Sequence, residues 1–201
     1  MRLNVRGPGV SRPVIPAIMK TSDFNYYLPP ELIAQHPPRR RTDARMMIVR
    51  RAGGAIVHAG IEDLPGLLSR GDLIVVNDTR VIPSRISGKK APGGGRVEAL
   101  FLEEVGPGRW SALCRMSGRL RPGVKLSLAG GRIAAEIVSV RPDGAAVLGI
   151  APGIPVREVL RDHGLTPLPP YIRRKDGPSP ADARRYQTVY AREPGAVAAP
   201  T

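Results

Sequence analysis

The stretch between residues 81 and 150 constrains the fold of this chain more than any other part of the sequence. Short runs rich in Val, Ile, Leu and Ala alternate there with turn dipeptides such as Pro107-Gly108 and Gly130-Gly131. No helical pattern lies between the runs, and short strands at regular spacing without helices predict a small antiparallel β-barrel. The expected strands cover residues 81–87, 96–105, 109–116, 124–128, 133–140 and 145–150.

The segments before and after this barrel combine helical and strand patterns. Residues 46–50 and 55–59 flank Gly53-Gly54, which is a strong hairpin signal. Leu73-Ile74-Val75-Val76 is a continuous apolar run, which predicts a strand covered on both faces of a sheet. The predicted fold class is therefore α/β, a large mixed α/β domain with a small antiparallel β-barrel domain inserted. Helices are expected at residues 61–69, 156–163 and 179–190.

This pattern divides the chain into four expected segments. Residues 1–18 contain Pro8, Pro13 and Pro16, which break any helix, so we expect a disordered tail or a misassigned start there, with Met19 as the natural first residue. Residues 19–80 are expected to form the first part of the α/β domain, and residues 81–152 the inserted barrel. Residues 153–201 then return to the α/β domain, which we expect to be incomplete.

The chain is strongly basic, with 31 Lys and Arg residues against 17 Asp and Glu residues and a formal net charge of +14. Such an excess favours an anionic partner, of which RNA is the commonest. The alternative is a compositional bias of a GC-rich genome, because Arg, Ala, Gly and Pro are all abundant. The hydrophobic content of 42% is high enough for a packed core, which excludes a wholly disordered chain.

Histidines and cysteine give no metal-binding pattern. His36, His58 and His163 are scattered, and none stands at ligand spacing with another His or with Cys114. We therefore expect no metal, and we expect Cys114 to be a small residue packed on the barrel. A single cysteine excludes an internal disulfide framework, which suits a reducing cytosol. No apolar run approaches the ~20 residues that a membrane-spanning helix requires, so we expect a cytoplasmic protein with no membrane contact.

One candidate site lies where the apolar run ends, at Asn77-Asp78-Thr79-Arg80, with Arg85 close behind. It combines an amide, a carboxylate, a hydroxyl and two guanidinium groups, and polar residues at the end of a buried strand often form a site. The alternative is a structural Asx-turn at the strand end, with Arg80 paired to Asp78.

A second candidate site combines aromatic and basic residues from two segments. Tyr171 and Arg173 belong to the first, and Tyr186, Gln187 and Tyr190 belong to the second. Aromatic rings interleaved with Arg suit stacking on bases and contact with phosphates. The alternative is a surface helix with its Tyr side chains packed inward.

Several long motifs in the chain resemble signatures of the S-adenosylmethionine:tRNA ribosyltransferase-isomerase family, bacterial enzymes of queuosine biosynthesis. The resemblance covers about residues 19–201 in the family's order. The family continues beyond Thr201 into a further C-terminal portion, so the chain resembles a C-terminally truncated member. The matching segments are residues 72–83, 167–173, 185–191 and 193–201, and residues 23–35 are also family-like.

The resemblance implies a tRNA-modifying enzyme. Members move the ribosyl part of S-adenosylmethionine onto 7-aminomethyl-7-deazaguanine at the tRNA wobble position, and isomerise it to give epoxyqueuosine while adenine and methionine leave. The implied cofactor is S-adenosylmethionine as the ribosyl-donating substrate, without a metal. The implied partner is tRNA that carries 7-aminomethyl-7-deazaguanine in the anticodon, bound by a monomeric enzyme.

Roles for individual residues follow from the matched motifs and from residue type. An alkylamine with a pKa near ~10 is mostly protonated at neutral pH, so its attack requires a base. Asp78 is the first candidate for that carboxylate and Glu193 the second. Tyr171 or Tyr186 is a candidate to stack on adenine, and Asn77 or Thr79 to hydrogen-bond it. The candidates to bind the methionine carboxylate or an RNA phosphate are Arg80, Arg85 and Arg173.

Two other interpretations remain open at the level of sequence. The chain could be a non-catalytic RNA-binding protein in which a barrel stands on an α/β base. It could also be an inactive fragment of the enzyme, and we expect little or no transferase activity from this chain alone.

Overall fold

A computed structural model describes residues 20–199 of the chain. Its contacts divide the chain into two units, Met1–Ala34 and Gln35–Thr201, and each is considered by itself. The described part of the first unit contains two short 3-10 helices, η1 (Thr21–Phe24) and η2 (Pro30–Leu32). The tail that the sequence predicts at residues 1–18 lies outside the described residues.

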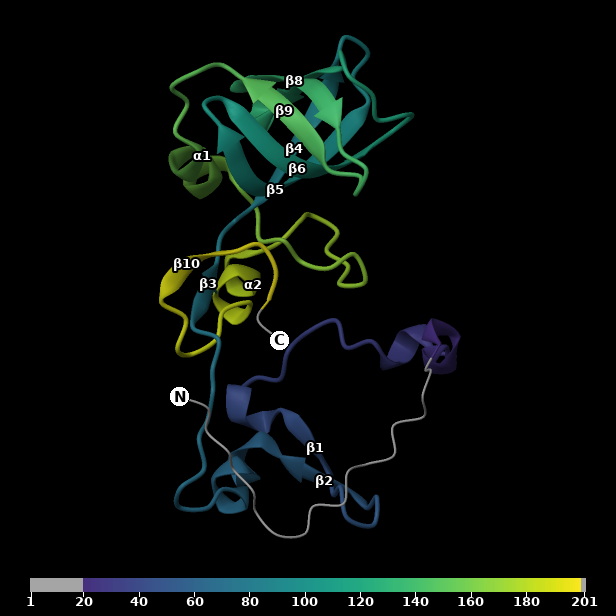
Figure 1. The fold of residues 1–201 in the computed structure, drawn as a ribbon, viewed down its shortest axis with the longest axis vertical. Helices are drawn as coiled ribbons and strands as arrows, with labels where there is room; N and C mark the ends of the chain where they lie inside the picture. Colours follow the sequence, from purple (N-terminus) through teal and green to yellow (C-terminus); the bar gives the residue numbers. More distant parts are fainter. Residues whose placement is uncertain (1–19, 200–201) are drawn as a thin grey trace, which may run out of the picture. The chain divides into compact units, whose positions relative to one another are not determined.

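A closed six-stranded antiparallel barrel dominates the second unit, with the strand order β4-β5-β6-β9-β8-β7. Figure 1 shows its strands in teal and green, wrapped around a common interior. The barrel predicted from the short runs and their Gly/Pro turns is thereby confirmed. Its strands are β4 (Arg85–Ala91), β5 (Arg96–Gly106), β6 (Arg109–Met116), β7 (Lys125–Leu128), β8 (Ile133–Val140) and β9 (Ala146–Ile150).

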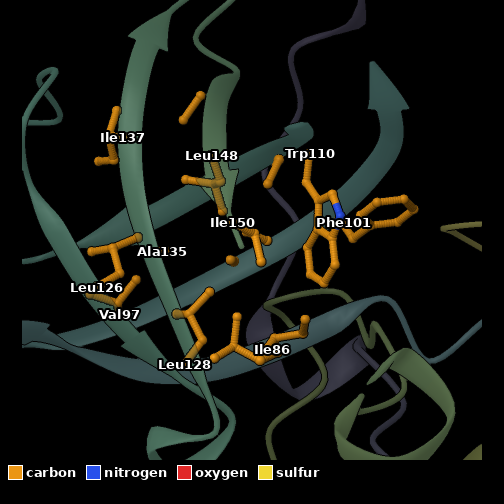
Figure 2. Packing of buried hydrophobic residues seen from close by; sticks show 14 of the residues in the cluster. Ile86, Val97, Phe101, Trp110, Leu126, Leu128, Ala135, Ile137, Leu148 and Ile150 are labelled. Atoms are coloured by element: carbon orange, nitrogen blue, oxygen red, sulfur yellow. The ribbon is translucent and has the colours of Figure 1, made fainter. Parts of the chain in front are cut away.

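The barrel interior is filled by alternate residues of each strand, because successive side chains point to opposite faces. Strand β8 shows this alternation clearly, with Ile133, Ala135 and Ile137 buried between exposed neighbours. Phe101 and Trp110 meet edge to face, with ring centroids 5.7 Å apart and ring planes at 86° (Figure 2). Each large apolar side chain buried in this way contributes about 1.5–3 kcal/mol of transfer free energy.

Helix α1 (Val156–His163) follows the barrel and adds Leu160 to the same buried cluster. The helix ends at Gly164, as its sequence pattern predicts. A β-carbon on Gly164 would overlap the backbone oxygen of Pro83, so this close approach of two backbone segments requires glycine.

A β-hairpin precedes the barrel in the chain, as Gly53-Gly54 predicts. Strands β1 (Arg45–Val49) and β2 (Ile56–Gly60) pair antiparallel. Both glycines of the turn have positive φ angles, 80° and 66°, which residues with a side chain rarely adopt. Two 3-10 helices flank this hairpin, η3 (Arg41–Asp43) and η4 (Ile61–Leu67), and the second stands where the sequence predicts a helix.

The strand predicted at Leu73-Ile74-Val75-Val76 is not formed, so this prediction is wrong. The four side chains are 51–88% exposed, and none of the four residues belongs to a strand. A strand needs a neighbour for its backbone hydrogen bonds, and no other segment among residues 20–199 pairs with this one. Hydrophobicity alone therefore predicted a burial that the described residues do not provide.

The strand predicted at residues 81–87 is split in two. Strand β3 (Thr79–Val81) ends before Pro83, and β4 begins after it. Proline has no backbone N–H for a ladder hydrogen bond, which explains the break.

Strand β3 pairs in parallel with β10 (Glu193–Ala196), which lies near the end of the chain. The chain thus leaves β3, forms the whole barrel and α1, and returns to a strand beside β3 (Figure 1). This connection confirms the expected insertion of a barrel into a mixed α/β fold. Helix α2 (Pro180–Arg185) lies on the return path, and it is shorter than the helix predicted at residues 179–190.

Candidate functional site

The pairing of β3 with β10 brings together the two candidate carboxylate residues, Asp78 directly before β3 and Glu193 at the start of β10. Thr79 stands opposite Glu193 in the register. The backbone N–H groups of Arg192 and Glu193 both donate to the carbonyl oxygen of Asp78, at N–O distances of 2.7 and 3.3 Å. Sequence motifs at opposite ends of the inserted barrel therefore meet in space, as Figure 1 shows for β3 and β10.

Gln187 fixes the end of β3 from the side. Its Oε1 accepts from the backbone N–H of Val81 at 2.9 Å, and its Nε2 donates to the carbonyl oxygen of Val81 at 2.8 Å. The side-chain amide thus satisfies both backbone groups of a buried residue, in the way a neighbouring strand would. Gln187 thus positions the backbone of Val81, and its place in a substrate-binding cluster stays a prediction.

Asn77 forms the turn that leads into β3. Its Oδ1 accepts from the backbone N–H of Thr79 at 3.0 Å and also from the Thr79 hydroxyl. Asn77 therefore forms the Asx-turn that we considered as the alternative to a functional site. This turn holds the side chains of Asn77 and Thr79 together and sets the backbone of Asp78 between them.

Asp78 pairs with Arg192 and not with Arg80, the partner that the Asx-turn alternative assigned to it. Arg192 Nη2 lies 3.4 Å from Asp78 Oδ2, and the side chains of Arg192 and Asp78 are 79% and 41% exposed. An exposed ion pair of this length is weak. Arg80 is exposed and has no ion pair within residues 20–199.

Arg85 and Tyr186 lie on the barrel side of this region. Arg85 donates from Nη2 to the carbonyl oxygen of Leu168, and its Nε lies 3.3 Å from Glu98 Oε1. The Tyr186 hydroxyl donates to the carbonyl oxygen of Pro167 at 3.3 Å. Arg85 and Tyr186 therefore both anchor residues 167–168 through backbone oxygens.

Burial is the main cause that raises the pKa of the Tyr186 phenol. A backbone hydrogen bond from Ala199 opposes it, the neighbouring Tyr171 adds to the rise, and Arg85 lowers the pKa. Tyr171 and Arg85 thus both lie within electrostatic range of Tyr186.

Tyr171 and Arg173 stand on an exposed loop that Gln35 holds. Gln35 donates from Nε2 to the carbonyl oxygen of Tyr171 at 3.0 Å and accepts at Oε1 from the backbone N–H of Arg173 at 2.8 Å. The Tyr171 side chain is 56% exposed, which leaves its ring accessible for stacking. Tyr190 is 46% exposed and is not brought to any other candidate residue by a hydrogen bond within residues 20–199.

Arg174 and Asp182 form the most buried ion pair near the site, and sequence reasoning did not identify it. The guanidinium is bidentate, with Nη2–Oδ1 at 2.8 Å and Nε–Oδ2 at 3.0 Å, and the two side chains are only 15% and 11% exposed. The hydrogen bonds from Arg174 hold the pKa of the Asp182 carboxyl well below its usual range, and Ser179 adds to the effect. The Ser-x-x-Asp spacing predicts the cap, but nothing in the sequence predicts the partner.

Two further residues were missed, and the reason is the same for both. Arg192 reaches Asp78 and Gln35 reaches Tyr171 only after residues distant in sequence have come together. A single sequence carries no signal for such contacts. Arg192 stands directly before the Glu193 motif, so its place next to a matched segment is the one hint available.

No group of three or more His, Cys, Asp or Glu side chains within residues 20–199 could hold a metal ion. Cys114 packs partly buried against the barrel core, as the sequence predicts, and burial raises the pKa of its thiol to about 11. A thiol with this pKa is mostly protonated near neutral pH and is a poor nucleophile.

The helices within residues 20–199 lack the length and apolar character needed to cross a membrane.

Comparison with known proteins identifies relatives over nearly the whole chain. A relative from Geobacter metallireducens is 47% identical over 188 residues, and one from Carboxydothermus hydrogenoformans is 43% identical over 183 residues. Both are named S-adenosylmethionine:tRNA ribosyltransferase-isomerase, and each alignment covers 91% of this chain. The chain spans about half the length of these relatives, 53% and 52% respectively.

A solved structure of S-adenosylmethionine tRNA ribosyltransferase from Thermotoga maritima is 29% identical, with a TM-score of 0.34 over 75% of this chain and 52% of that one. The sequence model of one family, described as queuosine biosynthesis protein, matches residues 21–201. That match includes both strands of the β3–β10 pair and the whole barrel between them. The chain therefore belongs to the queuosine biosynthesis protein family.

Proposed function

We propose that this chain supplies part of the site that transfers the ribosyl group of S-adenosylmethionine to a modified guanine in tRNA and isomerises it. The observation that carries the proposal is the parallel pairing of β3 with β10, which brings Asp78, directly before β3, next to Glu193, the first residue of β10. Family membership over residues 21–201 supports the same reaction class, since its named relatives are S-adenosylmethionine:tRNA ribosyltransferase-isomerases.

The reaction begins with an amine that must lose a proton. The aminomethyl group of 7-aminomethyl-7-deazaguanine has an ordinary pKa near ~10, so its reactive neutral form is scarce at pH 7. Asp78 is suited to accept that proton because its side chain is 41% exposed and its ion pair with Arg192 is long and open to solvent. Glu193, exposed on the adjacent strand, is the second carboxylate within the same region.

The nitrogen lone pair then forms a bond to a ribose carbon of S-adenosylmethionine. Over the isomerisation the N-glycosidic bond and the ribose C–S bond break, so that adenine leaves with a proton and methionine leaves with the electron pair on its sulfur. Tyr171 is the better candidate for stacking on adenine, because its ring is exposed while the Tyr186 hydroxyl is engaged by Pro167. The Oδ1 of Asn77 is occupied by its own turn, so its amide N–H groups remain to donate to the adenine ring.

The three candidate arginines separate by their present contacts. Arg80 and Arg173 have exposed side chains that suit a carboxylate or a phosphate. Arg85 already contacts Leu168 and Glu98, so we assign it to positioning the loop that bears Tyr171. We further propose that the protein acts as a monomer in the cytoplasm on tRNA carrying the modified base in its anticodon, without a metal.

A chimera tests this function, since the chain spans only about half the length of its relatives. Residues 21–201 of this chain replace the matching half of the Geobacter metallireducens relative, and adenine release from S-adenosylmethionine is measured. We expect release that depends on tRNA carrying the aminomethyl base, at a rate within about tenfold of the relative's own, which corresponds to ~1.4 kcal/mol in activation free energy.

The competing function is RNA binding without catalysis. It predicts a chimera that unfolds cooperatively and binds tRNA but releases no adenine, under conditions in which the relative does. That result would remove the proposed activity from this chain. A second control omits the tRNA, because hydrolysis of S-adenosylmethionine by itself also frees adenine.

A further inference from the structure

The barrel carries a groove that the proposed chemistry does not use. It has a volume of about 1060 Å³ and is lined by residues of β4, β5, β6 and β7 together with Gly130 and Gly131. Many of the lining side chains come from strand positions such as Ser87 and Lys89, which alternate with residues that face the core. The groove therefore belongs in large part to the outward face of the barrel.

The groove holds more positive charge than its one carboxylate can neutralise. Lys89, Arg96 and Arg115 line it, and all three side chains are exposed. None of the three forms an ion pair with another residue between positions 20 and 199. Glu98 is the acidic residue of the lining; it stands opposite Arg115 in the β5–β6 ladder, and its Oε1 lies 3.3 Å from Arg85 Nε. One carboxylate thus stands among three lining cations, so the lining keeps a net positive charge.

The strand register makes this arrangement unfavourable for the protein alone. Lys89 stands directly opposite Arg96 in the β4–β5 ladder and opposite Ser127 in the β4–β7 ladder. Like charges directly opposite each other across an antiparallel pair repel and destabilise the sheet. An anion bound between the two side chains would relieve that repulsion.

The lining also indicates which anion fits. It contains no aromatic side chain, and it offers the hydroxyl groups of Ser87, Ser117 and Ser127 beside the cations. Stacking on bases is therefore not available, whereas contact with successive phosphates along a backbone is. We propose that this groove binds the phosphate backbone of a helical stretch of tRNA, away from the modified base. The identity of the RNA as tRNA rests on the proposed function.

The test uses the 201-residue chain and an unmodified tRNA transcript, with binding followed by fluorescence anisotropy over a range of salt concentrations. Lys89→Glu is the test variant, because it reverses the charge and places a carboxylate opposite Arg96. Arg157→Glu is the matched control, with the same charge change at an exposed position of α1 outside the groove.

We expect Lys89→Glu to weaken tRNA binding by about tenfold or more and to reduce the slope of log affinity against log salt by about 1. Its melting temperature is expected to equal or exceed that of the parent, because a repulsive cross-strand pair becomes attractive. A merely structural Lys89 would instead lose stability and binding together. Arg157→Glu is expected to change affinity by less than about threefold, which reflects its effect on net charge alone.

Three outcomes overturn the proposal. They are an equal loss of tRNA affinity in Lys89→Glu and Arg157→Glu, unchanged tRNA binding in Lys89→Glu, and no tRNA binding by the parent chain. Polyglutamate of matched charge tests the other occupant, an acidic polypeptide. If polyglutamate displaces tRNA from the parent chain as effectively as a blunt RNA duplex displaces it, the groove does not select RNA over an acidic polypeptide. Adenine release by the chimera is a separate readout, so the groove can fail while the proposed function stands.

Discussion

At the scale of single residues, the site depends on side chains that substitute for missing backbone partners. Gln187 hydrogen-bonds both the N–H and the carbonyl oxygen of Val81, and Asn77 closes the turn before β3. β3 is only three residues long, so each of these contacts contributes a large part of what fixes its conformation. The candidate base Asp78 stands between them, and its position follows from theirs.

Replacing Gln187 should loosen β3 in a way that reveals the double hydrogen bond. Gln187→Met keeps the shape of the side chain but leaves both backbone groups of Val81 unpaired, so we expect a loss of about 1–3 kcal/mol in the free energy of unfolding. Urea denaturation measures this loss, and we expect the slope of unfolding free energy against urea concentration to stay unchanged. A loss near zero would mean that water replaces the amide without cost.

Gln187→Glu provides a pH-dependent control at the same position. Only a protonated carboxyl can both donate to and accept from Val81, so the folded state should raise the pKa of the new carboxyl. Gln187→Glu should therefore have a higher free energy of unfolding than Gln187→Met. This difference should be complete below the unfolded-state pKa of the new carboxyl and disappear as the pH rises through its folded-state pKa. An advantage that does not change between pH 3 and pH 8 would contradict the reciprocal bonding.

At the scale of elements, α2 is a short helix fixed at its first turn. Ser179 caps it and accepts from the backbone N–H of Asp182 at 3.1 Å, while Asp182 accepts from the backbone N–H of Ser179 at 2.9 Å. The same carboxylate binds Arg174 through two oxygens. This network sets the direction from which the chain continues to Gln187 and β10.

Asp182→Asn should therefore cost about 1.5–3 kcal/mol of stability at pH 7, because Arg174 keeps its charge but loses a charged partner. The folded state lowers the pKa of Asp182, so the parent's stabilisation is full above the unfolded pKa of about 3.8 and is lost as the pH falls through the folded value. We expect urea denaturation to show that the free energy of unfolding falls less between pH 7 and pH 3 in Asp182→Asn than in the parent.

Ser179→Ala is the matched control for that measurement. It removes the capping hydroxyl and should cost about 0.5–2 kcal/mol, but it keeps the Arg174–Asp182 pair. Its loss of stability between pH 7 and pH 3 should therefore resemble the parent's. If both variants lose the same amount with acid, the pH dependence comes from elsewhere in the molecule.

At the scale of the whole molecule, the sequence predicted the barrel far better than the rest of the fold. Strand positions in the barrel follow from local turns and alternation, and the predicted strands at residues 109–116 and 133–140 match β6 and β8. Leu73-Ile74-Val75-Val76 failed because burial depends on partners that a local pattern cannot supply. The β3–β10 pair was not predictable either, since the entire barrel separates its strands in sequence.

The candidate site shows the same division between local and long-range information. Motif resemblance selected Asp78, Glu193 and Gln187, and the structure brings these three into one region. The partner Arg192 and the bracing Gln35 depend on contacts between distant segments, so they emerged only from the structure. Arg85 was selected as a candidate to bind an anion, and its Nη2 donates to the backbone oxygen of Leu168. Residue type does not reveal which neighbours already occupy a side chain.

We propose that Asp78, held directly before β3, removes the proton from the attacking amine. Single-turnover adenine release by the chimera, compared between parent and Asp78→Asn, measures this step. We expect a loss of about 100-fold or more in the rate, since a general base contributes typically 10²–10⁴-fold. We expect a near-parental rate for Asp143→Asn, in a barrel turn where an amide oxygen can still accept from Ala145. A near-parental rate in Asp78→Asn would show that Asp78 is not the base.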